Sequence, residues 1–366
     1  MNPEVAPGTA TASALRVIPR AEHSISRRNI SPNALRVLYR LREGGYQAFL
    51  VGGCLRDLLL GVTPKDFDVA TSARPEEVKR LFRNCRLIGR RFRLAHVFFG
   101  REIIEVATFR AASAPSQGEE PDDDPDILPE VGASEDPAVP DTALPDEDEG
   151  EADVYAAAAG DRVFDEQGRI LRDNTYGTIE EDVWRRDFAC NALYYNIEDF
   201  SIWDYVGAME DIAARRLRLI GDAAQRYRED PVRMLRAVRF EAKLGFTLEA
   251  QTEAQIGELR HLLTQVPAAR LFDETLKLFL TGHGERSLEV LRRRELLGVL
   301  YPSVERYLRA HPGSLVERLL VEGLRNTDQR VAIGKTVTPT FLFTLLLYGP
   351  IAQYIERQPP EKWHDV

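Results

Sequence analysis

Three carboxylates on two expected strands are the residues of this 366-residue sequence best suited to chemistry. Asp66 and Asp68 flank Phe67, and Glu105 interrupts the apolar run Ile103–Ala107. Side chains alternate along a strand, so both aspartates should point to one side while Phe67 packs on the other. Hard oxygen ligands close together on rigid elements suit a divalent cation. The alternatives are solvated turn residues for the aspartates and one wet face of an edge strand for Glu105.

A glycine pair indicates a possible phosphate site upstream of these carboxylates. Gly52 and Gly53 lie between an expected strand and an expected helix, and Arg56 follows on the first turn of that helix. Glycines let a phosphate approach the backbone, the helix N-terminus offers free N–H groups, and Arg56 adds charge-assisted hydrogen bonds. A tight turn that binds nothing is the alternative interpretation.

Two later motifs combine acidic and basic side chains. Arg186 and Asp187, leading to Asn191, suit the phosphates and ribose of a nucleotide, although a surface salt-bridge cluster has the same composition. Asp230 and Arg233 are three residues apart, so on one helical face they offer an acceptor and donors to a base edge. A capping aspartate followed by a proline in the first turn explains the second motif equally well.

Apolar spacing and turn signals predict the elements that would position these residues. A first helix should have Ser31 as its cap and Pro32 in its first turn, and should end at Gly44 and Gly45. Short strands and helices then alternate, which predicts one mixed sheet with covering helices. The expected strands are 46–51, 67–70, 96–99 and 103–108, and the expected helices are 54–60 and 75–83. The second half is predicted to be helical, with helices at 231–244, 252–263, 268–280 and 285–297.

Composition divides the chain into an acidic segment and a basic remainder. Residues 111–160 hold sixteen Asp and Glu, seven Pro and no Lys or Arg, which predicts a disordered insertion. The chain carries −10 overall, whereas the remainder has 48 basic and 42 acidic residues, or +6, which permits an anionic partner. Three scattered cysteines argue against a disulfide framework or a zinc ribbon. Without an apolar run of about 18 residues, we expect no membrane span and a cytoplasmic protein.

Four ordered motifs then permit a comparison with a known family. VGGCLRDLLLGVTPKDFDVAT, IIEVATFR, RRDFACNALYYN and REDPVRMLRAVRFEAKLGF resemble the class II branch of the polymerase-β nucleotidyltransferase superfamily, which comprises bacterial poly(A) polymerases and CCA-adding enzymes. The leader RVIPRAEHSISRRNISPNALRVLYRL and the stretch RLFRNCRLIGRRFRLAHVFFG resemble the poly(A) polymerases more closely.

The resemblance implies an α+β fold. A nucleotidyltransferase head with a small mixed β-sheet and helices would be followed by an all-helical neck and body. The expected parts are a flexible tail (1–25), the head (26–215, with the acidic insertion 111–160), a nucleotide-recognition neck (216–280) and a body (281–366). Because the family normally continues through more helices, we expect the body to be truncated at its C-terminus.

The resemblance also implies roles for the residues above. Asp66 and Asp68 would hold two Mg²⁺ ions, with Glu105 as the third catalytic carboxylate. The implied nucleotide-binding residues are Gly52, Gly53, Arg56, Arg186, Asp187, Asn191, Asp230, Arg233 and Arg239. Basic residues crowd residues 74–93, and an RNA path is expected over Arg83, Arg86, Arg90, Arg91 and Arg93, with a solvated basic face as the alternative.

The implied activity is template-independent transfer of AMP from ATP to an RNA 3′ end, with release of pyrophosphate. A CCA-adding tRNA nucleotidyltransferase shares every motif and is the alternative enzyme. A non-catalytic RNA-binding protein descended from the family is the alternative from another class, and the intact carboxylates argue against it.

Overall fold

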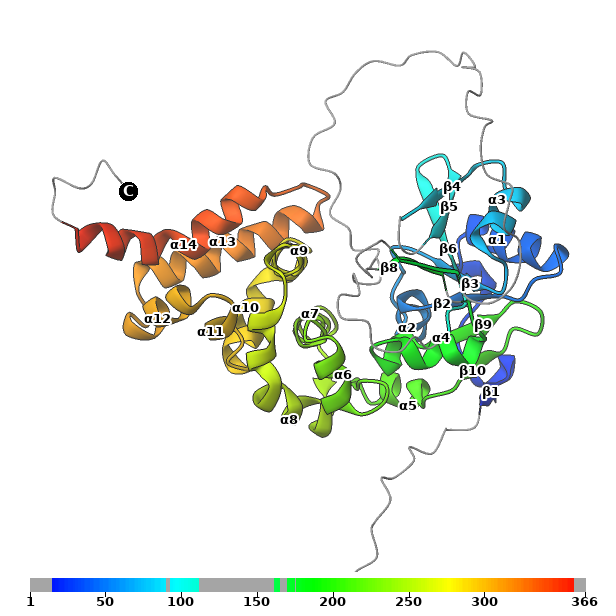
Figure 1. Ribbon diagram of the computed structural model, residues 1–366, viewed down its shortest axis with the longest axis horizontal. Coiled ribbons are helices and arrows are strands. Elements are labelled where there is room, and N and C mark those ends of the chain that lie inside the picture. The colour runs from blue at the N-terminus through cyan, green and yellow to red at the C-terminus, as the bar shows by residue number, and fades with distance from the viewer. Residues whose placement is uncertain (1–14, 90–92, 112–160, 165–169, 175, 359–366) are drawn as a thin grey trace, which may run out of the picture.

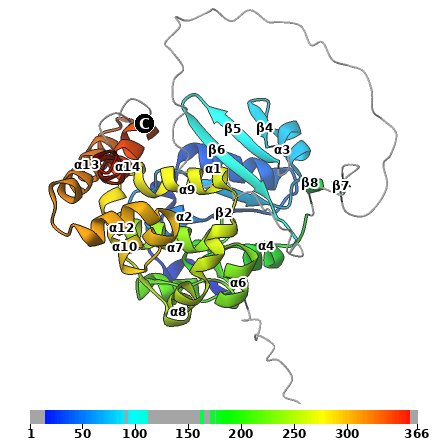
Figure 2. The same ribbon diagram turned by 60° about the vertical axis from the view of Figure 1, so that its left-hand side comes forward.

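The computed structural model describes residues 15–358 except 90–92, 112–160, 165–169 and 175. The chain forms two parts that lie side by side (Figure 1). A sheet-containing head consists of the elements from β1 to α5, and a helical arm consists of the elements from α6 to α14. Figure 2 shows from a second side that α13 and α14 lie at the end of the arm away from the head.

An eight-stranded mixed sheet forms the centre of the head, in the order β1-β10-β9-β2-β3-β6-β5-β4. Its strands pair antiparallel except β3 and β6, which run parallel. The strands are β1 (Arg16–Ile18), β2 (Ala48–Val51), β3 (Asp68–Thr71), β4 (Cys85–Ile88), β5 (Leu94–Phe99), β6 (Glu102–Thr108), β9 (Leu193–Asn196) and β10 (Ile202–Asp204). Two-stranded sheets join β7 (Asp161–Phe164) to β8 (Ile170–Asn174) and β11 (Arg216–Leu217) to β12 (Thr247–Leu248).

The helices of the head cover and connect these strands, and those of the arm pack on one another. Within the head they are α1 (Pro32–Glu43), α2 (Gly53–Leu59), α3 (Pro75–Leu81), α4 (Ile179–Arg185) and α5 (Ala208–Ala213). In the arm they are α6 (Ala223–Glu229), α7 (Arg233–Leu244), α8 (Ala250–Leu259), α9 (Ala268–Phe279), α10 (Gly284–Arg293), α11 (Leu297–Leu300), α12 (Pro302–Ala310), α13 (Leu315–Ala332) and α14 (Pro339–Glu356). Short 3-10 helices are η1 (Arg20–Glu22), η2 (Arg27–Asn29), η3 (Ala189–Asn191) and η4 (Arg260–Gln265).

Strand register decides which side chains share a face of the sheet. Asp68 lies opposite Val51 on one side and Glu105 on the other, and Val51 in turn lies opposite Tyr194. Directly opposed residues point to the same face. Asp68, Glu105 and Tyr194 therefore share one face, and Tyr195 points to the other, on which α1 packs.

Local sequence signals explain the ends of α1. Ser31 caps the helix by accepting hydrogen bonds from the backbone N–H groups of Asn33 (3.1 Å) and Ala34 (3.4 Å). Pro32 occupies the first turn, where its missing N–H costs nothing. The predicted start and end of this helix are confirmed.

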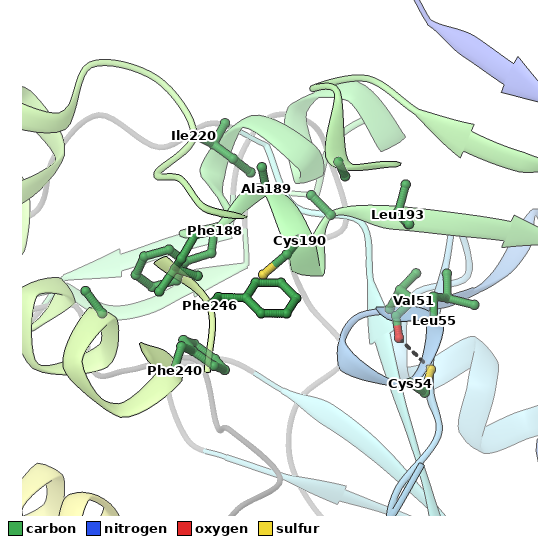
Figure 3. Packing of buried hydrophobic residues seen from close by; sticks show 14 of the residues in the cluster. Val51, Cys54, Leu55, Phe188, Ala189, Cys190, Leu193, Ile220, Phe240 and Phe246 are labelled. Carbon is green, nitrogen blue, oxygen red and sulfur yellow. Dashed lines mark hydrogen bonds between the residues drawn. The ribbon is translucent and has the colours of Figure 1, made fainter. Parts of the chain in front are cut away.

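One apolar core continues from the head into the arm. Figure 3 shows Phe188, Ala189 and Cys190 of the head packed near Phe240 and Phe246 of the arm. The Phe188 and Phe240 rings meet edge to face, with centroids 5.3 Å apart. Such packing ties α7 to the strands behind it, so the junction is part of the core.

The predicted α+β class, with a sheet-containing head before helices, is confirmed. The flexible tail expected for residues 1–25 is wrong for Arg16–Ile25, because β1 pairs with β10 and the side chains of Ile18 and Ile25 are buried. The predicted disorder of the insertion lies outside the described residues, apart from Ala111. The boundary between neck and body stays a prediction.

The described residues also bear on the cysteines and on membrane crossing. Cys54, Cys85 and Cys190 are buried free thiols. Burial raises the pKa of the Cys190 thiol to about 12. Across the part of the chain that the structure describes, every helix is too short or too polar to cross a membrane.

Candidate active site

A cleft in the head brings most of the predicted site residues together. It is bounded by β2, β3, β6, α2, the segment after α4 and one side of α7. Seven cationic and five acidic side chains line it. These are Arg56, Lys65, Arg110, Arg185, Arg186, Arg236 and Lys243, with Asp57, Asp66, Asp68, Glu105 and Asp187. A cleft with paired carboxylates inside a cationic wall suits a metal-assisted reaction of a polyanion.

The three predicted catalytic carboxylates all line this cleft. Asp68 and Glu105 are register partners on the parallel pair β3–β6, so the sheet itself sets their spacing. Glu105 also lies 3.5 Å from His96, measured from Oε2 to Nε2. Asp66 differs from the prediction, because β3 begins only at Asp68 and Asp66 lies exposed in the preceding segment. The placement of the two aspartates in one cleft holds, whereas the argument from strand alternation does not.

The fit to Mg²⁺ rests on two carboxylates rather than on a closed cage. Nowhere in the described residues do three or more His, Cys, Asp or Glu side chains cluster closely enough to hold a metal ion by themselves. Mg²⁺ in nucleotide enzymes is commonly held by one or two carboxylates together with substrate phosphates and water. Asp66 and Asp68 beside a cationic cleft meet that requirement.

Gly52 has a backbone conformation that other residues avoid. Its φ is 82° and its ψ is −151°, at the N-cap of α2. A Cβ atom at this position would lie 3.5 Å from Oδ2 of Asp68. The glycine therefore provides both the turn from β2 into α2 and space beside the carboxylate.

This conformation predicts the effect of Gly52→Ala, with Gly61→Ala as the matched control. Gly61 also has a positive φ, 73°, but a Cβ there would meet nothing within 4 Å. Both variants should lose roughly 1–3 kcal/mol of unfolding free energy through backbone strain. Only Gly52→Ala should also lower kcat/KM for nucleotide addition, measured where both variants are folded. If Gly52→Ala and Gly61→Ala lose kcat/KM equally, Gly52 affects stability alone.

Arg56 and Asn191, both predicted to bind nucleotide, contact each other. Nη1 of Arg56 donates to Oδ1 of Asn191 at 2.6 Å, and Nε donates to Oδ1 of Asp57 at 2.9 Å. Only 3% of Arg56 is exposed. Its guanidinium thus links α2 to η3 at the edge of the cleft and has little freedom to move.

A buried aspartate that sequence reasoning missed holds Arg186. Oδ2 of Asp182 accepts from Nη2 of Arg186 at 3.1 Å and from the Tyr194 hydroxyl at 2.6 Å. Oδ1 accepts from Nε of Arg185 at 3.0 Å. Burial alone would raise the pKa of the Asp182 carboxyl, but the two arginines and the hydrogen bonds outweigh it and lower the pKa to about 2. Asp182 is therefore an ionised anchor for two cationic side chains of the cleft.

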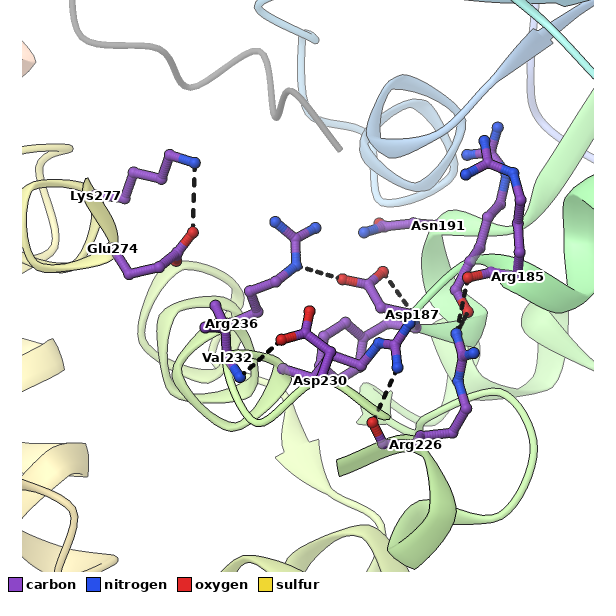
Figure 4. Close-up of polar contacts among 12 residues, drawn as sticks. Arg185, Asp187, Asn191, Arg226, Asp230, Val232, Arg236, Glu274 and Lys277 are labelled. Atoms are coloured by element: carbon purple, nitrogen blue, oxygen red, sulfur yellow. Dashed lines mark hydrogen bonds and ion pairs between the residues drawn. The ribbon is translucent and has the colours of Figure 1, made fainter. Parts of the chain in front are cut away.

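Asp187 connects the head to the arm. Its Oδ2 accepts from Nε of Arg236 on α7 at 2.6 Å, as Figure 4 shows, and its Oδ1 accepts from the backbone N–H of Phe188 at 2.7 Å. Arg226 on α6 adds a second connection, because its Nη2 donates to the carbonyl oxygens of Arg185 (2.8 Å) and Arg186 (2.7 Å). These contacts set the position of α6 and α7 relative to the cleft.

The predicted base-reading residues lie outside the described lining of the cleft. Asp230 accepts from the backbone N–H of Val232 at 3.1 Å and from Nη2 of Arg270 at 2.7 Å. Arg233 donates to the carbonyl oxygen of Arg226 at 2.9 Å and to Oε2 of Glu229 at 3.3 Å. Asp230 thus orders the turn that precedes α7, whereas the N-cap residue is Val232 and no side chain caps this helix. Base reading stays a prediction. Arg239 is 2% exposed and lies over the Phe240 ring, 5.4 Å from its centroid.

The expected RNA path is only partly described. Arg83 and Arg86 are exposed, and Arg86 lies 5.5 Å from the Phe98 ring centroid. Nη1 of Arg93 pairs with Oε1 of Glu76 at 2.8 Å. Arg90 and Arg91 lie outside the described residues. None of the three described arginines is among the residues that line the cleft, so an RNA path over them stays a prediction.

Sequence reasoning missed most of the cationic wall. The missed cations are Lys65, Arg110, Arg185, Arg236 and Lys243. Lys65 directly precedes Asp66, and Arg185 directly precedes Arg186, so both were adjacent to recognised motifs. Arg236 and Lys243 are seven residues apart on α7, a spacing that places them on one helical face.

Two family profiles match the chain. One, described as the poly A polymerase head domain, matches residues 48–218, and the other, described as the probable RNA and SrmB-binding site of polymerase A, matches residues 245–308. The cleft described above is formed mainly by residues of the first profile.

Curated relatives and solved structures agree with these profiles. Poly(A) polymerase I of Salmonella typhi is 46% identical over 343 residues, which are 94% of this chain and 65% of that protein. Poly(A) polymerase I of Escherichia coli O157:H7 is 46% identical over 352 residues, or 95% and 67%. The CCA-adding enzyme of Leuconostoc mesenteroides is 31% identical over 264 residues, or 72% and 53%.

Among solved structures, the Bacillus stearothermophilus CCA-adding enzyme in complex with CTP matches with a TM-score of 0.55 at 26% identity, covering 92% of this chain and 81% of that one. This chain spans about 65% of the length of the Salmonella protein. From the profiles, the identities and the shared fold, we conclude that the chain belongs to the family of bacterial poly(A) polymerases and CCA-adding enzymes.

Proposed function

We propose that this chain transfers AMP from ATP to RNA 3′ ends without a template and releases pyrophosphate. The observation that carries the proposal is the pairing of Asp68 with Glu105 on parallel strands, beside Asp66 and opposite a cationic wall. Carboxylates alone would repel a triphosphate, and cations alone would bind one without a place for metal ions. Their combination in one cleft supports nucleotidyl transfer.

Each part of the cleft has a distinct task in this proposal. Asp66 and Asp68 would hold two Mg²⁺ ions, which when bound offset negative charge at the reacting phosphate. Gly52 and Gly53 let the triphosphate approach the N-terminus of α2, where N–H groups are unpaired within the helix. Arg186, held in place by Asp182, neutralises phosphate oxygens.

The arm contributes the remaining contacts. Arg236 and Lys243 extend the cationic wall from α7 towards the sheet. Arg236 forms an ion pair with Asp187, so its guanidinium is already oriented before the nucleotide binds. Preset charges stabilise a transition state without having to reorganise during the reaction.

Base selection remains assigned to Asp230 and Arg233 by our proposal. Arg233→Ala should weaken discrimination of ATP against CTP and UTP by about tenfold, or roughly 1.4 kcal/mol, because one good pair of hydrogen bonds to a base is worth about that much. The affinity of the Arg233→Ala variant for RNA should change little. The measurement is kcat/KM for each nucleotide with one primer. Unchanged selectivity, with a loss of stability only, would assign Arg233 to the contacts with Glu229 and Arg226.

One experiment separates polyadenylation from CCA addition. Purified protein is given an oligo(A) primer or a tRNA that lacks its CCA end, each with ATP or CTP. We expect a long ATP-dependent ladder on oligo(A), in line with the higher identity to poly(A) polymerases. Addition of C, C and A to the tRNA, followed by a stop, would overturn this expectation. Absence of any product with either RNA would favour the non-catalytic alternative.

A further inference from the structure

A second cationic pocket lies on the face of the sheet opposite the cleft. Its lining consists of Arg20, Ser26, Arg27, Arg28, Leu35, Tyr39, Tyr195 and Phe200. Six of these eight residues come from the leader segment that precedes and includes α1. Tyr195 points to this face, whereas its neighbour Tyr194 contacts Asp182 on the cleft side. We call this group the rear pocket.

The arginines of the rear pocket lack acidic partners. Among the described residues, no carboxylate forms an ion pair with Arg20, Arg27 or Arg28, and no carboxylate belongs to the lining. Two acidic residues of the turn between β9 and β10 have other partners, because Glu198 pairs with Arg42, and Oδ1 of Asp199 accepts from the Ser201 backbone and hydroxyl at 3.0 and 2.7 Å. Three arginines therefore line one pocket whose lining contains no carboxylate.

The protein also fixes the shape of this pocket. Nη1 of Arg20 donates to the carbonyl oxygen of His23 at 2.9 Å, and Nη1 of Arg27 donates to the Tyr39 hydroxyl at 3.0 Å. The Arg27 guanidinium also lies 4.6 Å from the centroid of the Phe200 ring. Phe200 has a φ of 61°, uncommon for a bulky residue, and its carbonyl oxygen lies 2.8 Å from Nε2 of His23. Phe200 lies in the turn between β9 and β10, so these contacts tie the leader segment to that turn.

A buried hydroxyl at the floor of the rear pocket is the second, independent observation. Tyr195 is 0% exposed, and its hydroxyl has no hydrogen-bond partner among the described residues. A buried polar group without a partner is costly, so native proteins nearly always satisfy it. Tyr195 and the exposed arginines line the same pocket, so a phosphate that enters it can accept a hydrogen bond from this hydroxyl.

From these observations we infer that the rear pocket binds a phosphate of single-stranded RNA. This inference rests on the proposed function, which makes RNA the substrate. Arginine guanidinium groups pair with phosphate oxygens, and the half-exposed Tyr39 offers a ring on which a base can stack. A cationic groove with an aromatic platform is how proteins bind single strands irrespective of sequence. The rear pocket would thus hold a part of the RNA away from its reacting 3′ end.

The test compares rear-pocket variants with a matched surface variant. The first variant carries Arg20→Gln and Arg28→Gln together, and the second carries Tyr195→Phe. The control is Arg36→Gln, which removes an exposed arginine of α1 outside the rear pocket. Because the Tyr195 hydroxyl has no hydrogen-bond partner among the described residues, Tyr195→Phe should leave the melting temperature unchanged or raise it. Any loss of RNA affinity in that variant therefore cannot come from unfolding.

Binding is measured by fluorescence anisotropy with labelled oligo(A) at several salt concentrations. The double variant should bind a long oligo(A) about tenfold more weakly at low salt, and the slope of log affinity against log salt should fall by about 0.7, the value for one neutralised phosphate of a single strand. Tyr195→Phe should weaken binding by a smaller factor, and Arg36→Gln should match the parent protein. The inference is wrong if both rear-pocket variants bind RNA with the same affinity and the same salt dependence as the control.

Nucleotide and activity measurements separate the remaining outcomes. If the double variant binds free ATP more weakly but oligo(A) normally, the rear pocket takes free nucleotide and the inference about RNA is wrong. With a diadenylate primer, whose single internucleotide phosphate lies next to the reacting 3′ end, the double variant should add AMP at the parent rate, whereas its KM for a long primer should rise. If the parent protein adds no nucleotide, the proposed function fails, but the anisotropy comparison still decides whether the rear pocket binds RNA.

Discussion

Asp68→Asn should reduce the rate of nucleotide addition by at least roughly a thousandfold, equivalent to about 4 kcal/mol of transition-state stabilisation. The amide keeps the size of the side chain but removes the charge that a divalent cation requires. Asp68 is the carboxylate that the sheet places directly opposite Glu105, and a Cβ at Gly52 would come within 3.5 Å of its Oδ2. Its position is therefore fixed by backbone pairing, and a neighbouring carboxylate cannot replace it.

The measurement is single-turnover extension of an oligo(A) primer with saturating ATP and Mg²⁺. Asp273→Asn, a change at an exposed position on α9 outside the cleft, serves as the control and should extend the primer at the parent rate. The melting temperature of Asp68→Asn should stay close to that of the parent, because the substitution changes charge and leaves packing intact. Near-normal extension by folded Asp68→Asn, or failure of this variant to fold, would contradict the assignment.

Residue type and local spacing were sufficient to predict the parts of the site that lie close together in sequence. Asp68 and Glu105 were identifiable because carboxylates are unusual beside apolar strand residues and because two strands of one sheet can bring them together. Asp66 was identified with them, although it precedes β3 and the argument from strand alternation does not apply to it. Gly52 was identifiable because a glycine between a strand and a helix commonly allows a tight turn or a close approach of a ligand to the backbone. Both inferences depend on short-range rules that tertiary packing left unchanged.

Contacts between distant residues could not be predicted in this way. Asp182 lies in a run of acidic residues at the start of α4, which resembles a solvated helix end, and its partner Tyr194 is on β9, beyond η3. Asp230 and Arg270 are forty positions apart, so their ion pair depends on how α7 and α9 pack. The three residues of β1 carry too little pattern to indicate a strand, and only pairing with β10 orders them.

Asp182→Asn should lower the free energy of unfolding at pH 7 by about 3 kcal/mol, because it leaves Arg185 and Arg186 beside a neutral amide in a largely buried position. It should also raise the KM for ATP, since Arg186 would lose the anchor that holds it at the cleft. Tyr194→Phe is the matched comparison, because it removes one hydrogen bond to the same carboxylate and keeps the charge. Its loss of stability should be about 1 kcal/mol.

The dependence on pH distinguishes an ionised Asp182 from a neutral one. Its folded-state pKa of about 2 lies below the ordinary value of 3.8, so the ion pairs stabilise the fold fully above about pH 5 and progressively less as the pH falls towards 2. A difference of nearly two pKa units corresponds to about 2 kcal/mol. The difference in unfolding free energy between the parent and Asp182→Asn should therefore be constant from pH 7 to about 5 and become smaller below that. The corresponding difference for Asp273→Asn should stay near zero. Urea denaturation at each pH measures both differences in unfolding free energy. If the difference between the parent and Asp182→Asn stays constant down to pH 3, the Asp182 carboxylate is not the charged partner of the two arginines.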